Sequence, residues 1–189
     1  MTFKTKKYSF LVLALATILL SACKKEVGGE ENEEEIITTL QLVFTPQGGG
    51  TSLTYAFEDP DGPGGIAPAV DNIRLAAHTT YAVVAAFLNK TENPVDDITP
   101  EIVQEGESHR IYYIPSAGSN ITVSNLSLDV LGMPLGVTST WQTGAVSTGT
   151  VTVTLRHYGG NPPNKGAGDP VDSPKSSTDA EVAFPVIVE

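Results

Sequence analysis

The sequence has little cysteine and little positive charge. Cys23 is the only cysteine among 189 residues, so an intrachain disulfide is excluded even in an oxidising compartment. Lys and Arg number 11 against 22 Asp and Glu, and the few basic residues form no cluster. Binding to nucleic acid or to anionic lipid headgroups rests on clustered Lys and Arg, so we expect no nucleic-acid partner.

Long hydrophobic runs are also scarce. The one such run, residues 10–20, is eleven residues long, whereas a helix needs about twenty apolar residues to cross a bilayer. Three lysines precede the run, and Ser21-Ala22-Cys23 follows it. A basic segment, an apolar segment and a small-residue cleavage site make an export signal, so we predict a signal peptide over residues 1–22.

The segment Leu20-Ser21-Ala22-Cys23 is typical of the cleavage and lipidation site of a bacterial lipoprotein. We expect diacylglycerol on the Cys23 thiol; the alternative is ordinary cleavage that leaves the thiol unmodified. A multiply acylated cysteine holds a protein firmly to a membrane, whereas a single acyl chain binds only marginally. Removal of residues 1–22 leaves 8 basic against 22 acidic residues, a net charge of −14.

Residues 23–35 are predicted to be a lipidated, acidic and flexible tether. Residues 24–35 contain six glutamates, two glycines and a single apolar residue, Val27, so the segment repels itself and cannot bury a core. In sequences that resemble surface lipoproteins of the Bacteroidota, acidic residues soon after the lipidated cysteine direct export to the cell exterior. Lys24 and Lys25 depart from that pattern, and a plain spacer is the alternative.

Residues 36–189 are predicted to form one all-β domain. Short runs of Val, Ile, Thr, Tyr and Phe alternate with Gly, Pro, Asn and Asp clusters, and 154 residues suffice for one core. A single short helix is indicated by Thr99-Pro100-Glu101, with Thr99 as N-cap, and ends before Gly106. We predict an antiparallel two-sheet immunoglobulin-like sandwich, with a small β-barrel as the alternative. The nine expected strands are 40–44, 53–57, 73–77, 81–88, 108–114, 121–126, 137–141, 149–157 and 182–188.

Four features of this domain give sharper expectations. Residues 81–88 are apolar on both parities, which indicates a central strand covered on each face. Pro185 indicates an edge strand, and the Pro-, Gly- and Ser-rich residues 159–178 indicate a mobile loop. Trp141 shares the parity of Val137 and should be buried between the sheets.

The candidate ligand-binding residues are two histidines and a glutamate. Glu105, Glu107 and His109 lie at i, i+2 and i+4, so an extended chain projects them from one face. His157 has the inward parity of Val153 and ends its strand. If the strand ends are neighbours, His109, His157 and Glu107 suit Zn²⁺ or a similar divalent ion. Solvated glutamates and hydrogen-bonded histidines are the alternative.

Three tyrosines lie near these histidines in the sequence. Tyr112, Tyr113 and Tyr158 are placed to stack on a planar ligand such as haem. No Gly-x-Ser-x-Gly, His-Glu-x-x-His or nucleotide-binding loop occurs, and Ser108 beside His109 points to the opposite face. We therefore expect no enzyme and assign no catalytic residue.

Nine segments that span nearly the whole domain carry a resemblance to known proteins: Ile36-Ile37-Thr38-Thr39, Phe44-Thr45-Pro46, residues 59–65, Thr79-Thr80-Tyr81, Phe87-Leu88-Asn89, Asp97-Ile98-Thr99, Glu107-Ser108-His109, Leu155-Arg156-His157 and Phe184-Pro185-Val186. In these segments the chain from Ile36 onward resembles a group of Bacteroidota lipoproteins labelled "type 1 periplasmic binding fold superfamily protein". The resemblance implies an outer-membrane lipoprotein, at the cell surface or on the periplasmic face, that works beside a TonB-dependent transporter.

Two functions of different classes follow from the sequence. A binding accessory would capture a nutrient, metal ion or haem and pass it to a transporter. A non-catalytic adhesion or interaction module would only present its surface to a protein or glycan. Bound metal or haem in protein from the native host would favour the first function.

The lipidation site is directly testable. Cells grown with labelled fatty acid should incorporate the label into the wild-type protein and not into Cys23→Ser, because only the thiol accepts the diacylglycerol. Equal labelling of the two proteins would show that Cys23 is not the anchor.

Overall fold

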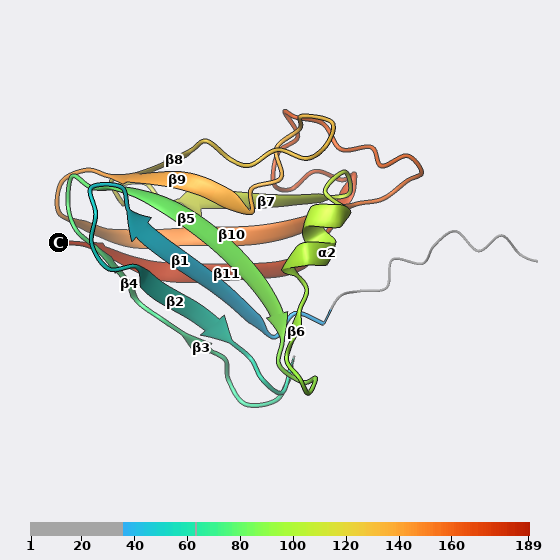
Figure 1. Cartoon of the computed structure of the whole chain (residues 1–189), viewed down its shortest axis with the longest axis horizontal. Helices are drawn as coiled ribbons and strands as arrows, with labels where there is room; N and C mark the ends of the chain where they lie inside the picture. The colour runs from blue at the N-terminus through green and yellow to red at the C-terminus, as the bar shows by residue number, and fades with distance from the viewer. Residues whose placement is uncertain (1–35, 63) are drawn as a thin grey trace, which may run out of the picture. The chain divides into compact units, whose positions relative to one another are not determined.

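The computed structural model describes residues 36–62 and 64–189. These residues form two β-sheets and one short helix, α2, as Figure 1 shows. The predicted two-sheet sandwich is confirmed, and the described strands do not close into a barrel. The predicted signal peptide, the Cys23 anchor and the tether lie outside the described residues.

The first sheet has β1 and β5 at its centre. The strand order is β3-β2-β1-β5-β9-β8, with the short β6 also paired to β5, and every pairing is antiparallel. The strands are β1 (Thr39–Pro46), β2 (Leu53–Glu58), β3 (Ala69–Val70), β5 (Thr80–Asn89), β6 (Asp96–Asp97), β8 (Ile121–Ser124) and β9 (Thr138–Thr143).

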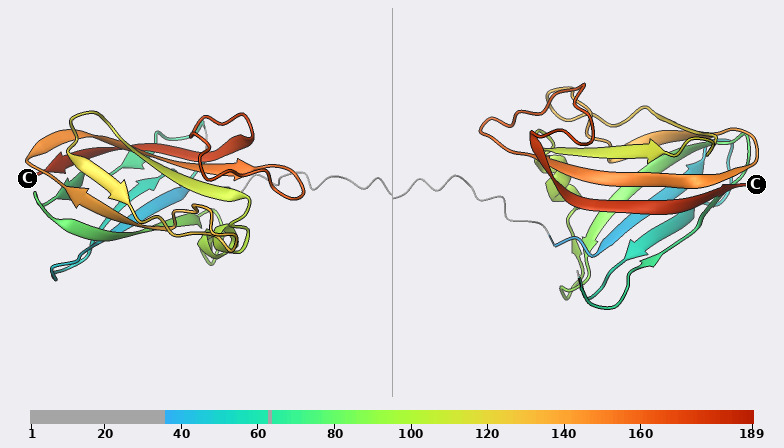
Figure 2. Two further views of the ribbon diagram at one scale, coloured as in Figure 1. Left: turned by 90° about the horizontal axis from the view of Figure 1, so that it is seen from above. Right: turned by 180° about the vertical axis from the view of Figure 1, so that it is seen from behind.

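The second sheet has the order β4-β11-β10-β7. In the view from behind in Figure 2, β11, β10 and β7 lie side by side. The β4–β11 pair is parallel, so the sandwich is not antiparallel throughout. The strands are β4 (Ile73–Leu75), β7 (His109–Pro115), β10 (Ser147–Tyr158) and β11 (Ser176–Val188).

All nine expected strands are present, and the two-residue strands β3 and β6 are added. The largest boundary difference is in β11, which begins at Ser176 rather than at residue 182. Its first residues are polar and half-exposed, so they carry no apolar alternation. They are nevertheless strand residues because β10 pairs with them as far as Ser176.

Helix α2 (Thr99–Gln104) has Pro100 in its first turn and Glu105 as its C-cap, close to the predicted bounds. The predicted N-cap is wrong by one residue, because Ile98 occupies that position. The Thr99 hydroxyl instead accepts a hydrogen bond from the Phe87 backbone N–H of β5. The hydroxyl therefore joins the helix to the first sheet rather than capping it.

Trp141 is buried between the sheets, as predicted, with no exposed surface. Its ring meets Phe44 of β1 edge-on at 5.1 Å between centroids and Tyr113 of β7 at 5.6 Å. Phe44 belongs to the first sheet and Tyr113 to the second, so this one indole packs against both sheets. Such edge-to-face pairs add to the free energy gained by burying the rings.

Two predictions about individual strands need correction. β5 is central, but its outer face is not covered, since Val84 is 44% exposed. β11 is not an edge strand, because it pairs with both β10 and β4. β4 reaches only Val186–Val188, however, so in the described structure Pro185 has a strand partner on one side only. The proline therefore interrupts no pairing with β4.

Trp141→Ala should lower the free energy of unfolding by about 3–5 kcal/mol, because it leaves a large cavity between the sheets. The matched control is Val84→Ala on the exposed face of β5, which should change stability by no more than about 0.5 kcal/mol. Urea denaturation of both variants measures the difference. Equal midpoints for the two variants would place the indole outside the core.

Candidate metal centre

Three potential metal ligands meet where β7 begins and β10 ends. His109 and His157 lie directly opposite each other on these antiparallel strands, with ring centroids 4.6 Å apart. Asp179 of β11 is the third residue. One ligand atom from each of the three residues lies within 4.8 Å of the other two. The predicted proximity of the two histidines is thus confirmed.

A β-bulge brings Asp179 to the histidines. Leu155 pairs with Ala180 and Arg156 with Thr178, so Asp179 is the extra residue between two regular pairs. A bulge interrupts the alternation of side chains between faces and redirects the extra residue. The Asp179 carboxylate consequently reaches the histidine side of the sheet, where its side chain is only 4% exposed.

The ligand separations are close to those of a bound ion. The Asp179 Oδ2 atom lies 3.9 Å from His109 Nε2 and 4.0 Å from His157 Nδ1. Both distances exceed those of hydrogen bonds. Tetrahedral Zn²⁺, with ligands about 2.1 Å away, places them about 3.4 Å apart. These two separations therefore exceed those around a bound Zn²⁺ by about half an ångström, and all three lie within 4.8 Å.

The orientation of His109 suits ligation. Its Nδ1 lies 3.2 Å from the backbone carbonyl oxygen of Glu105, at the C-cap of α2. When Nδ1–H donates to that oxygen, Nε2 carries the lone pair and faces Asp179. Metal-binding histidines commonly use their second nitrogen in this way, which fixes both the tautomer and the ring.

Burial keeps both imidazoles neutral near pH 7. Burial and the neighbouring His157 lower the pKa of His109 from 6.5 to about 4, against the opposing effect of the Glu105 carbonyl. Burial also lowers the pKa of His157, which the Glu105 carboxylate opposes. A metal ion binds neutral imidazole, so no proton has to leave either ring at neutral pH.

The three side chains differ in their exposure to solvent. Those of His109 and Asp179 are 1% and 4% exposed, whereas that of His157 is 19% exposed. An ion would therefore reach the cluster from the His157 side. The Glu105 carboxylate is exposed and raises the pKa of His157, so it adds negative potential on that side.

A buried lysine holds the start of β7 in place. The Lys165 ammonium donates hydrogen bonds to the backbone carbonyl oxygens of His109 at 2.9 Å and Pro134 at 3.3 Å, and to that of Gly106. It also forms an ion pair with Asp129 at 2.6 Å, and both side chains are at most 1% exposed. Breaking such a pair on one side leaves a buried charge and is strongly destabilising.

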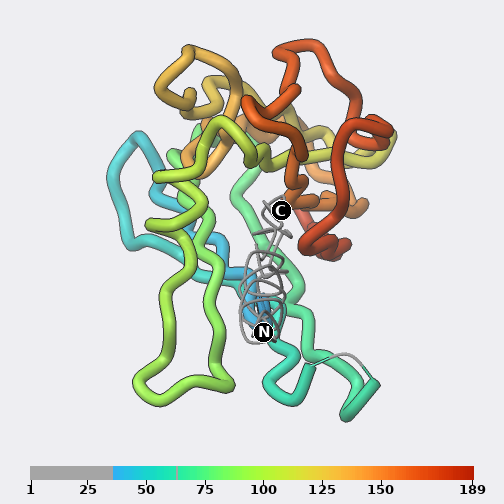
Figure 3. The backbone as a smooth tube through the Cα atoms, turned by 90° about the vertical axis from the view of Figure 1, so that its right-hand side faces the viewer, coloured from blue at the N-terminus to red at the C-terminus, as the bar shows by residue number. Residues whose placement is uncertain are grey.

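The loop predicted over residues 159–178 is shorter than expected, because residues 176–178 belong to β11, and its remainder is hydrogen-bonded to the domain. Arg110 donates to three carbonyl oxygens of this segment, at Gly166, Ala167 and Asp169. Lys165 ties the same segment to the loop 125–136, and Figure 3 shows the two loops next to each other. A Gly- and Pro-rich composition permits many conformations, but the hydrogen bonds of Lys165 and Arg110 favour this one.

The three tyrosines do not form a stacking surface for haem, which corrects that prediction. Tyr112 and Tyr113 are 7% and 8% exposed, and Tyr158 is fully buried. The hydroxyls of Tyr112 and Tyr158 are 2.7 Å apart, and Tyr113 donates to the Gly136 carbonyl oxygen. Their rings are therefore core and their hydroxyls are structural.

Glu107 is not among the clustered ligands, and Asp179 stands in its place. The prediction for Glu107 assumed an extended chain before His109, whereas residues 105–108 form turns and the strand starts only at His109. Asp179 lies in a polar segment with no apolar alternation, and a bulge leaves no signature there. Nothing in the sequence marked it as a ligand.

No family model, curated protein or solved structure matches this chain. The resemblance to Bacteroidota lipoproteins thus stays a prediction. Within residues 36–62 and 64–189, no helix has the length and apolar character needed to cross a membrane.

The low pKa of His109 predicts how stability depends on pH without metal. The unfolded chain protonates His109 near pH 6.5 and the folded protein only near 4, so stability is lost as pH falls between these values. The loss from His109 should approach about 3 kcal/mol, and His157 adds to it in the same direction.

His109→Asn should remove the pH-dependent loss of stability that comes from His109. The difference in free energy of unfolding between the variant and wild type should therefore narrow as the pH falls. Urea midpoints measured with excess chelator between about pH 7.5 and 4.5 test this. Parallel curves for the two proteins would contradict it.

Proposed function

We propose that this protein is an outer-membrane lipoprotein, anchored through Cys23, whose β-sandwich binds a divalent transition-metal ion at His109, His157 and Asp179. It acts without catalysis, as a binding accessory to metal uptake beside a TonB-dependent transporter. The observation that carries the proposal is the convergence of three ligand atoms within 4.8 Å from three neighbouring strands.

The donor atoms indicate the class of ion. Two imidazole nitrogens and one carboxylate oxygen suit Zn²⁺ and its first-row neighbours, whereas Mg²⁺ and Ca²⁺ prefer oxygen ligands alone. Three protein ligands leave at least one coordination position for water or for a carrier molecule. Haem is not part of the proposal, because the tyrosines that would stack on it are buried.

The cluster lies at the end of the sandwich where the described chain enters the domain. The start of β1, the helix α2 and the end of β10 all lie at that end (Figure 1). Ile36 lies three residues before the start of β1.

A second candidate function is a protein interaction module. Between β8 and β9, the tip of the loop 125–136 exposes Leu128, Val130 and Leu131, which are 59%, 83% and 61% exposed. Asp129 makes this tip rigid by accepting hydrogen bonds from the N–H groups of Leu131 and Met133. A fixed apolar tip suits insertion into a partner's pocket.

Zn²⁺ titration of the full-length protein tests the metal site near pH 7.5. Asp179→Asn, His109→Ala and His157→Ala should each weaken binding by at least about a hundredfold, since each removes one of three ligands. Calorimetry on protein freed of metal by chelator gives the affinities. The matched control is Glu107→Gln, which removes a carboxylate close to His109 in the sequence but outside the cluster. Asp179→Asn and Glu107→Gln variants that bind equally would exclude the proposed site.

A further inference from the structure

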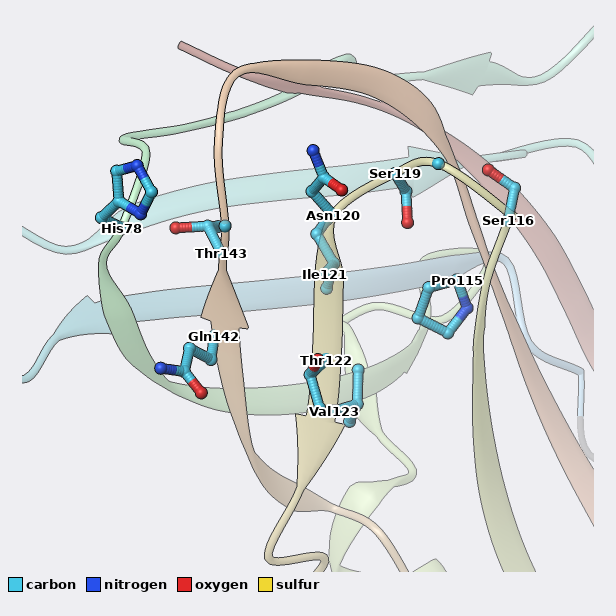
Figure 4. Close-up of a pocket in the computed structure, with 12 residues that line it drawn as sticks. His78, Pro115, Ser116, Ser119, Asn120, Ile121, Thr122, Val123, Gln142 and Thr143 are labelled. Atoms are coloured by element: carbon cyan, nitrogen blue, oxygen red, sulfur yellow. The ribbon is translucent and has the colours of Figure 1, made fainter.

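A hollow lies at the end of the sandwich opposite the candidate metal centre. Its walls are the turn before β5, the end of β7 and the loop that follows it, residues 121–123 of β8, and the end of β9 with the turn that follows it (Figure 4). Its volume is about 680 Å³, within the range of small-molecule sites. Strand β7 separates the hollow from the candidate metal centre. His109 of the cluster begins this strand, and Pro115, which lines the hollow, ends it.

The three loops around this hollow are joined to one another by hydrogen bonds. The His78 N–H donates to the Gly144 carbonyl oxygen at 2.9 Å, and the Gly144 N–H donates to that of Asn120 at 2.7 Å. The Asn120 side-chain amide donates to the Ala145 carbonyl oxygen at 3.1 Å. The loops therefore form one preorganised surface, which lowers the entropic cost of binding a ligand.

Backbone strain is concentrated in the same loops. His78 and Asn120 have φ values of 53° and 52°, in the left-handed region that residues other than glycine seldom adopt. Only one other described residue apart from the glycines, Asn125, has a positive φ. Such strained residues often cluster where a ligand is held.

Most side chains of the hollow carry hydroxyl or amide groups, and Pro115, Ile121 and Val123 add an apolar part. Its lining contains neither a carboxylate nor a Lys or Arg. Thr122 and Gln142 pair across β8 and β9, and both are exposed. Neither side chain hydrogen-bonds to any residue that the structure describes, so their donors and acceptors are available to a ligand. Figure 4 shows the two residues on neighbouring strands.

We infer that this hollow binds a neutral, polyhydroxylated ligand, that is, a carbohydrate. Hydroxyl and amide side chains both donate and accept hydrogen bonds, as sugar hydroxyls do. An anionic or cationic ligand would find no opposite charge in the lining, and an apolar ligand would leave the amides unsatisfied.

Saturation-transfer NMR on the full-length protein tests this inference with a panel of neutral probes: the methyl glycosides of glucose, galactose, mannose and N-acetylglucosamine, and maltohexaose. At least one probe should receive saturation from the protein. Gln142→Ala and Thr122→Ala should each weaken its binding by about three- to tenfold, the effect of one lost hydrogen bond.

The matched controls are Gln104→Ala on α2 and Thr54→Ala on β2. They shorten exposed side chains of the same two types outside the hollow and should leave binding unchanged. Excess chelator is present throughout, so the result does not depend on the metal site. The inference is overturned if no probe receives saturation, or if all four variants bind alike. It is also overturned if an extended peptide library binds through β8 and the sugars do not.

Discussion

The register of β10 against its two neighbours determines the rest of the second sheet. Twelve residues of β10 pair with β11 and seven with β7. Because side chains alternate with a period of two, a slip of one residue would turn Val151, Val153 and Leu155 to the solvent. The burial of these three side chains therefore fixes the register. The same register sets His157 opposite His109, so the core also specifies the histidine pair.

The candidate metal centre lies where this regular pairing ends. From Val151 to Leu155 the inward positions of β10 are aliphatic, and the next inward position is His157. On β11 the inward positions are aliphatic or aromatic back to Val182, and the bulge then introduces Asp179. Polar ligands at the end of an apolar core combine low exposure with a route for an ion from solvent. A regular strand in place of the bulge would not direct Asp179 to the histidines.

The sequence-based expectations are accurate where strands alternate apolar and polar residues, and less accurate at the polar strand ends. Alternating apolar residues are sufficient to find all nine principal strands and the buried Trp141, because burial imposes the alternation. The meeting of His109 and His157 could be predicted in part, since both lie at strand ends and His157 shares the parity of Leu155. The sequence does not reveal that β7 and β10 are neighbours, and their antiparallel pairing is what sets His109 opposite His157.

The errors arise where local composition and long-range contacts disagree. Residues 159–175 have the composition of a mobile loop, but two sets of hydrogen bonds hold them. Lys165, within the segment, donates to the carbonyl oxygen of His109, and Arg110 donates to the carbonyl oxygen of Gly166 in the segment. The tyrosines have the composition of a ligand surface, but Tyr112 and Tyr158 satisfy each other's hydroxyls inside the domain. In each case the partner is more than 40 residues away, or its position depends on a strand pairing. No window of the sequence contains that information.

The core also separates the two candidate binding sites. β7 runs from His109 in the metal centre to Pro115 beside the hollow, about 20 Å along an extended strand. Between these ends lie Ile111 and Tyr113, which pack into the common core. Groups farther apart than about 10 Å that share no partner usually act independently. An ion at one end should therefore leave the other end unchanged.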